Sequence, residues 1–287
     1  MTRRTFISLQ RRILSGVLTA ILALAANAVF LAPSSAKDGA IAVDVELVLA
    51  VDVSYSMDPD EQRIQRDGYA QALTSPQFLN ALKSGTHGKI AIIYLQWASS
   101  LDQDVLLPWT IIDGPQSAQA VADKLAEAPY RRAQRTSISG AIDFAMKQFP
   151  DNGFNGERQV IDVSGDGTNN NGRPVTTARD EAVQQGITIN GLPLLIRPSS
   201  YGYFNDIANL DEYYEDCVIG GIGAFSIPIK DRGNFIEATR TKLVLEVAAA
   251  PPPGIFDGKV AIVPAQAREP RVSCLVGENM WRNRWGN

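Results

Sequence analysis

The chain alternates continuous apolar segments with segments of helical character, and this alternation constrains its fold more than any other feature. Predominantly apolar runs predict strands at 41–52, 89–98, 102–112, 158–167 and 187–196. Helical patterns follow at 58–82, 115–128, 137–149, 174–186, 203–217 and 232–248. Strands that are apolar along their whole length are covered on both faces. We therefore predict an α/β fold with a doubly wound, mostly parallel central sheet flanked by helices. The short segment 223–229 is expected to be an edge strand, and the sheet is expected to include one antiparallel edge strand.

The sequence divides into three parts. Residues 1–36 are predicted to be a signal peptide, and residues 37–250 a folded domain. The sequence PPPG, which starts at Pro251, cannot continue a helix and is typical of a stiff linker. Residues 251–287 are therefore expected to form a linker and an irregular C-terminal tail. This tail carries arginines and tryptophans, which would suit either a docking segment or a flexible end.

The N-terminal part has the pattern of an export signal. Its 36 residues contain arginines but no acidic residue, and an apolar stretch runs from Ile13 to about Leu31. Small residues then offer a cleavage site after Ala36, so we expect a periplasmic or secreted protein. The start resembles a twin-arginine signal at Arg3, Arg4 and Phe6. A second arginine pair beside the apolar stretch suits the general secretory route as well, and the alternative to cleavage is a membrane anchor.

Composition excludes several classes of function. The net charge is −4 although the signal region is basic, so the remainder is acidic and unsuited to nucleic acid. Cys217 and Cys274 could form one disulfide in an oxidising compartment, but they cannot build a zinc site of four thiolates. His87 is the only histidine and lies in a turn-like segment. A catalytic triad is therefore poorly supported, and we interpret His87 as a solvated loop residue.

Three oxygen-bearing side chains follow the first strand at alternate positions, namely Asp52, Ser54 and Ser56. In an extended segment, alternate residues turn their side chains to the same side. The segment lies where a parallel strand ends, which is the edge at which such sheets bind ligands. A carboxylate and two hydroxyls around one point suit a hard cation such as Mg²⁺.

The D-x-S-x-S pattern resembles the metal-ion-dependent adhesion site of von Willebrand factor A-type domains, the group that includes integrin I domains. That family completes its site with a threonine from a later loop and an aspartate after a later strand. Thr136 precedes a helix, and Asp166 stands in Asp-Gly after an apolar strand. The order of the motifs matches, and the resemblance covers residues 42–248.

The resemblance implies roles for these residues. Ser54 and Ser56 would coordinate the metal directly, and Thr136 would join them in the ligand-ready state. Asp52 and Asp166 would act largely through water while supplying charge. One position would stay open for an acidic group of a partner protein or peptide. The cofactor implied is Mg²⁺, with Mn²⁺ or Ca²⁺ as alternatives.

Each element of this pattern also has a purely structural interpretation. The serines and the Asp-Gly pair could be turn residues, and Thr136 could be a helix N-cap. Asp58 and Glu61 have the spacing of a capping box, so we assign them to the start of a helix and not to the metal. The polar segment 168–171 could line the site or form an ordinary solvated loop.

These observations favour a binding protein over an enzyme, because neither serine has an adjacent base that could activate it. One alternative is a Mg²⁺-dependent phosphohydrolase, since GDGTNN resembles the motif of haloacid-dehalogenase-type enzymes. Those enzymes need acids where this chain has Ser54 and Asn170. The other alternative is a structural domain that has the fold and binds no metal.

Overall fold

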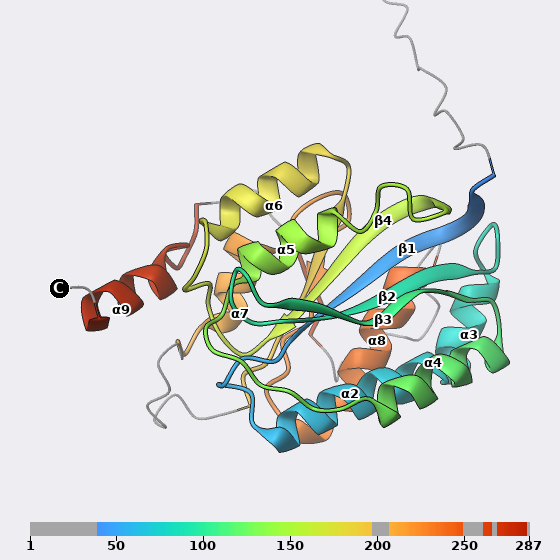
Figure 1. Ribbon diagram of the computed structural model, residues 1–287, viewed down its shortest axis with the longest axis horizontal. Helices are drawn as coiled ribbons and strands as arrows, with labels where there is room; N and C mark the ends of the chain where they lie inside the picture. Colours follow the sequence, from blue (N-terminus) through green and yellow to red (C-terminus); the bar gives the residue numbers. More distant parts are fainter. Residues whose placement is uncertain (1–38, 197–206, 249–260, 266–268, 286–287) are drawn as a thin grey trace, which may run out of the picture. The chain divides into compact units, whose positions relative to one another are not determined.

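The computed structural model describes residues 39–196, 207–248, 261–265 and 269–285. They belong to one compact unit, Gly39–Asn287 (Figure 1). The predicted signal peptide and the start of the predicted linker lie outside the described residues. Within the described part of the chain, no helix combines the length and the apolar character needed to cross a bilayer.

A seven-stranded sheet forms the centre of the unit, in the order β3-β2-β1-β4-β5-β6-β7. Its strands are β1 Ile41–Asp52, β2 Ile90–Trp97, β3 Gln103–Ile112, β4 Phe154–Gly165, β5 Thr188–Pro193, β6 Phe225–Ser226 and β7 Val263–Pro264. β1 pairs in parallel with both β2 and β4, and β5 continues the parallel order beside β4. The predicted doubly wound, mostly parallel α/β sheet is confirmed.

The sheet has antiparallel pairs at its two sides. β3 runs antiparallel to β2 and forms one edge. At the other side, β6 is parallel to β5, and the two residues of β7 pair with it in the antiparallel sense. Segment 223–229 is therefore not the outermost strand, as the sequence had suggested, because residues from the C-terminal tail cover it.

Helices cover both faces of the sheet. They are α2 Pro59–Leu73, α3 Pro76–Lys83, α4 Pro115–Glu127, α5 Ile138–Met146, α6 Val175–Gln184, α7 Leu210–Tyr213, α8 Phe235–Val247 and α9 Val276–Trp285. α2, α3, α4 and α8 pack together on one face, and α5 and α6 pack on the other (Figure 1). α7 continues into a π-helical turn, Tyr214–Val218, on the second face.

Three helical predictions need correction. The segment 58–82 forms two helices because Ser75 caps a new helix whose first residue is Pro76. The segment 203–217 is helical only from Leu210 onward in its described part. The C-terminal tail is not irregular throughout, since α9 forms a helix of ten residues.

The core consists of two apolar layers, one on each side of the sheet. β1 shows how its sequence supplies both: Leu47 and Leu49 face the layer under α2 and α8, while Val48 and Ala50 face the layer under α5. All four side chains are fully buried. This is the alternation of a strand covered on both faces, and it explains why the apolar run is continuous.

A group of charged side chains lies inside the layer between the sheet and α8. The Lys242 ammonium lies 2.8 Å from an Asp162 carboxylate oxygen and also pairs with Glu246. The side chains of all three are buried. Burial raises the pKa of Asp162 to about 7, even though Lys242 opposes this shift. The lysine is thus the counterion that keeps two carboxylates in the core.

The topology places a binding edge at the carboxyl end of β1. After β1 the chain adds β2 on one side of it, and later adds β4 on the other side. The helices that follow these strands therefore lie on opposite faces, and the loops separate at the strand ends. Asp52 ends β1, and Asp166 follows β4 directly, so the two aspartates meet at this edge.

Candidate metal centre

A chain of short hydrogen bonds joins the residues predicted at the end of β1 to the residue predicted after β4. The Ser54 backbone N–H donates to Asp52 Oδ1 over 2.6 Å. The Ser54 and Ser56 hydroxyls lie 2.7 Å apart, and the Ser56 hydroxyl donates to Asp166 Oδ1 over 2.6 Å. The structure therefore brings Asp52, Ser54, Ser56 and Asp166 into one cluster.

Asp58 closes the loop and takes no part in this cluster through the bonds described. Its side chain accepts the Glu61 backbone N–H, and the Glu61 carboxylate accepts the Asp58 backbone N–H. This reciprocal pair is a capping box at the start of α2. The assignment of both residues to the helix start is confirmed.

Thr136 is joined through its backbone to the loop that follows Asp166. The stretch before it follows the loop after β1, because the Ala133 backbone N–H donates to the Val53 carbonyl over 3.0 Å. The Thr136 backbone N–H donates to Asn170 Oδ1, and the Asn170 N–H donates back to the Thr136 carbonyl. The N-cap of α5 is Ser137, whose side chain accepts the Gly140 N–H. The N-cap interpretation of Thr136 is therefore wrong.

The loop after Asp166 is buried and not an ordinary solvated loop. Thr168 and Asn169 are fully buried, and Asn170 is 5% exposed. The Asn169 side chain accepts the Ser139 backbone N–H and donates to the Arg173 carbonyl and to Glu278. Sequence reasoning missed the roles of Asn169 and Asn170, which hold the two distant loops together. The TNN run after Asp-Gly was the only signal for them.

The carboxylate of Asp52 has an unusual environment within this cluster. Asp52 is fully buried, and its Oδ2 atom has no hydrogen-bond partner. Burial raises the pKa of Asp52 to about 7, and its hydrogen bonds with Ser54 offset only part of this effect. A buried carboxylate oxygen without a partner is costly, and a nearby cation would remove that cost. The donor set, made of carboxylates and hydroxyls, fits a hard divalent cation.

Gly165 makes room for this carboxylate. A β-carbon at Gly165 would lie 2.8 Å from Asp52 Oδ2 and 3.1 Å from the Tyr214 hydroxyl oxygen. The last residue of β4 must therefore lack a side chain if Asp52 is to keep its position. Tyr214 comes from the π-helical turn that also carries Cys217.

The rim of the cluster combines an aromatic and a basic side chain. Ser56 is partly exposed and Asp166 is 9% exposed, whereas Ser54 and Thr136 are 1% exposed. Tyr55 is 50% exposed. The Arg132 guanidinium donates to the Tyr55 carbonyl and lies 5.2 Å from the centre of its ring. An exposed cation thus stands beside the loop that carries the two serines.

A second group of possible metal ligands comes from the other end of β1. Ligand atoms of Asp44, His87 and Glu157 all lie within 4.8 Å of one another. The Asp44 carboxylate, however, already accepts the backbone N–H groups of His87 and Lys89. Its evident role is to hold the loop before β2. The prediction that His87 is only a solvated loop residue missed this proximity to two carboxylates.

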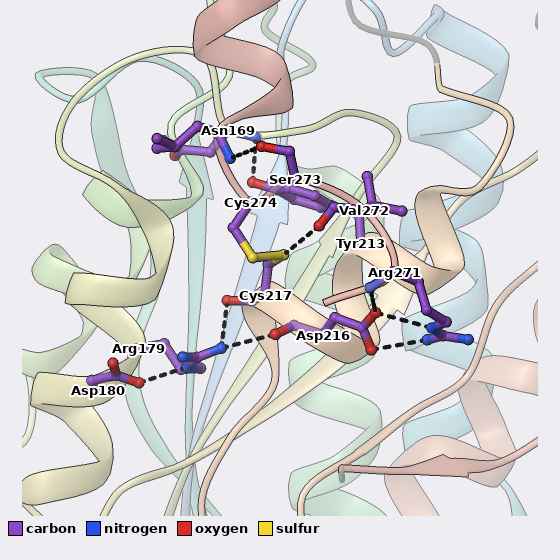
Figure 2. The surroundings of a disulfide bond; sticks show 11 residues. Asn169, Arg179, Asp180, Tyr213, Asp216, Cys217, Arg271, Val272, Ser273 and Cys274 are labelled. Atoms are coloured by element: carbon purple, nitrogen blue, oxygen red, sulfur yellow. Dashed lines mark hydrogen bonds and ion pairs between the residues drawn. A yellow bond between two sulfur atoms is a disulfide. The ribbon is translucent and has the colours of Figure 1, made fainter. Parts of the chain in front are cut away.

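The predicted disulfide is present. Cys217 and Cys274 are joined by a bond of 2.06 Å, and their α-carbons are 5.5 Å apart (Figure 2). It links the π-helical turn after α7 to the segment before α9. Both cysteines of the chain are used, so the tail is fastened to the sheet domain.

Solved structures with a similar fold were found at low sequence identity. The pilus adhesin SpaC from Lactobacillus rhamnosus GG, in its open conformation, has a TM-score of 0.51 and 11% identity, covering 71% of this chain and 30% of the adhesin. Proximal thread matrix protein 1 from the mussel byssus, with a zinc-occupied MIDAS motif, has a TM-score of 0.49 and 12% identity, covering 72% of this chain and 48% of that protein. The von Willebrand factor type A protein from Catenulispora acidiphila has a TM-score of 0.47 and 13% identity, covering 72% of this chain and 43% of that protein. This chain thus spans less than half of each protein, and the likeness to SpaC bears on the fold alone.

The sequence matches none of the curated proteins with which it was compared. A family model does match, over residues 42–251, and its description is "Protein of unknown function (DUF1194)". This region runs from β1 through α8 and includes the cluster around Asp52 and Asp166. The chain therefore belongs to the DUF1194 family, and its mostly parallel sheet is consistent with the von Willebrand factor A-type fold that its sequence resembles.

Proposed function

We propose that this protein is an exported binding protein whose metal site captures an acidic group of a partner protein or peptide. The metal would be held by Asp52, Ser54, Ser56, Thr136 and Asp166. The observation that carries the proposal is the buried Asp52 Oδ2, which has no hydrogen-bond partner although it stands beside the linked Ser54, Ser56 and Asp166 oxygens. A divalent cation would satisfy all of these groups at once.

The donor set also supports capture of a carboxylate. Hydroxyl ligands are neutral, so a cation held by serines and a threonine keeps much of its charge. A carboxylate that entered an open coordination position would gain strongly from that charge. The exposed Arg132 beside Tyr55 would add attraction for an acidic partner. We propose Mg²⁺ as the cation, with Mn²⁺ or Ca²⁺ as alternatives.

The disulfide supports export to the periplasm or beyond. Disulfides persist in oxidising compartments and are rare in the reducing cytoplasm. The pairing of Cys217 with Cys274 therefore agrees with the signal pattern in residues 1–36. Processing after Ala36 is part of this proposal, and mass spectrometry of the mature protein tests it.

Calorimetric titration of the purified protein with Mg²⁺ and with Mn²⁺ tests the metal site. We expect saturable binding to the wild type and no detectable binding to Asp52→Ala, with the folded circular dichroism spectrum retained. His87→Ala is the matched control, because it removes a ligand from the second cluster and should leave the affinity unchanged. Unchanged affinity in Asp52→Ala, or loss of affinity in His87→Ala, would show that the ligands are misassigned.

Partner capture tests the finer part of the proposal. In an envelope extract, partners should be retained by the wild type with Mg²⁺, and released by EDTA or by the Asp52→Ala change. Release by a carboxylate-rich peptide would support an acidic contact group. Mg²⁺-dependent turnover of an aryl phosphate, abolished by Asp52→Asn, would instead establish a phosphohydrolase and overturn the binding-only view.

A further inference from the structure

The segment from Arg271 to α9 lies against the loops that carry two of the proposed metal ligands. Three features fasten this segment to the π-helical turn: the Cys217–Cys274 disulfide, the buried Val272, and Arg271, whose guanidinium and backbone N–H both donate to Asp216 (Figure 2). The Asp216 side chain of this ion pair is buried. We call residues 271–284 the C-terminal strap.

The strap continues from its anchor to the loop after Asp166. Gly277, in the first turn of α9, packs so closely that a β-carbon there would lie 2.1 Å from the Asn169 carbonyl oxygen and 2.4 Å from Thr168 Oγ1. Only a glycine allows the helix to approach the loop this closely. The next residue, Glu278, accepts a hydrogen bond of 2.7 Å from the Asn169 side chain.

The strap also contacts the loop that leads to Thr136. The Arg135 guanidinium lies 3.3 Å from the centre of the Trp281 ring, which is a cation–π contact. Arg135 has a positive φ of 74°, a conformation that non-glycine residues rarely adopt and that surrounding contacts must maintain. Arg135 directly precedes Thr136, so the strap contacts the chain beside one ligand and within three residues of the other.

Asn169 and Asn170 connect these contacts to the metal ligands. Asn170 exchanges two hydrogen bonds with Thr136, and Asn169 accepts the Ser139 N–H at the start of α5. The Asn169 backbone N–H donates to the Tyr213 hydroxyl, next to the turn that carries Cys217. The strap thus packs on Asn169, one of the two asparagines whose side chains hold the Thr136 and Asp166 loops in register. Without this cover, water would compete for their hydrogen bonds.

We infer that the C-terminal strap is a positioning element of the metal site, and that the Cys217–Cys274 disulfide raises the cation affinity by keeping the strap in place. This inference rests on the proposed metal-binding function. Gly277, Glu278 and Trp281 are its positioning residues. They act on the ligands through Asn169 and Arg135. Partners that orient metal ligands typically change affinity by about 10- to 100-fold when they are removed.

The test combines cation affinity with a measurement that needs no metal. Gly277→Ala and the double change Cys217→Ser with Cys274→Ser should each bind Mg²⁺ or Mn²⁺ about 10- to 100-fold more weakly than the wild type in calorimetry. In EDTA, the Asn170 and Ser139 amides of both variants should exchange hydrogen about tenfold faster or more. Asn279→Ala, an exposed change on the same helix, is the control and should match the wild type.

Each outcome has a distinct meaning. Folded variants with wild-type affinity and wild-type exchange would overturn the role of the strap, while the metal site itself would stand. A wild-type protein that binds neither cation would overturn the proposed function. It would also overturn the inferred effect of the strap on cation affinity. If Gly277→Ala does not fold, Glu278→Ala tests the same contact, because it removes the acceptor of Asn169 and leaves the helix backbone unchanged. Unchanged exchange and affinity in that variant would count equally against the inference.

Discussion

Gly165→Ala is a change that should disturb the proposed metal site without removing any proposed ligand. The new β-carbon would lie 2.8 Å from Asp52 Oδ2 and 3.1 Å from Asp52 Cβ. Ordinary contact begins near 3.4 Å, so the carboxylate must retreat by about 0.6 Å for van der Waals repulsion to vanish. The backbone of Gly165 has no positive φ, so alanine adds contact and not backbone strain.

The surroundings of Asp52 make that retreat difficult. Asp52 and Tyr214 are both fully buried, and the Tyr214 hydroxyl lies 3.1 Å from the same β-carbon position. Overpacking of a buried site costs about 1–3 kcal/mol of folding free energy. A shifted ligand that supplies charge should weaken cation binding by about 10- to 100-fold, which corresponds to about 1.4–2.7 kcal/mol of binding free energy.

Two measurements separate these effects. Urea unfolding in EDTA gives the loss of folding free energy, and calorimetric titration with Mg²⁺ gives the loss of affinity. Gly114→Ala is the matched control, because the position has an extended φ of 174° and no atom within 4 Å of its β-carbon. Wild-type stability together with wild-type affinity in Gly165→Ala would refute the placement of the Asp52 carboxylate against Gly165, and with it the geometry of the site.

Three further predictions concern the body of the domain. Lys242→Ala should lower the free energy of unfolding by about 3–5 kcal/mol in urea titration, because it leaves the Asp162 and Glu246 carboxylates buried without their counterion. A loss below about 1 kcal/mol would contradict the buried charge cluster. The pKa of Asp162 is raised to about 7 in the folded state from 3.8. The folded chain therefore keeps this proton over a pH range in which the unfolded chain has already lost it, and the stabilisation from the proton is lost as the pH rises from about 4 to about 7. Asp162→Asn cannot titrate, so its stability should depend less on pH over this range than that of the wild type; equal slopes would place the titration elsewhere. Cys217 and Cys274 are separated by 57 residues, so reduction of their disulfide should lower the free energy of unfolding by about 4 kcal/mol on the chain-entropy estimate. Urea unfolding with and without reductant measures this loss, and a difference near zero would show that the disulfide does not constrain the unfolded state.

The fold could be predicted because its signals are local. The strand that ends in Asp52 is mostly apolar, and the spacing of Asp58 and Glu61 predicts the start of the next helix. The candidate ligand set was also chosen from local motifs, since each candidate residue stands at the end of a strand or before a helix. The structure brings Asp52, Ser54, Ser56 and Asp166 together as this order implied.

The missed features depend on contacts between distant segments. The segment at 223–229 is not the edge strand that was expected, because β7 pairs with it on its outer side. β7 has only two residues, too few for a pattern of hydrophobicity to predict a strand. The contact between Gly277 and Asn169 could not be predicted from the sequence of the tail, because a single glycine in a helical segment does not indicate which residue it packs against. Asn169 and Asn170 have side chains typical of loops, and their roles as connectors follow only from the three-dimensional arrangement.

The parallel pairing of β1 with β4 has a consequence for the kinetics of folding. The hydrogen bond from Ser56 to Asp166 joins residues 110 positions apart, and it can form only after the two strands have come into register. Pairing of strands so far apart along the chain closes a long loop before it gains contacts, so it is among the slow events of folding. The two halves of the cluster are therefore separate until β1 and β4 have paired. Cation binding during refolding should appear no earlier than this pairing, so that the ion reports when the centre of the sheet has formed.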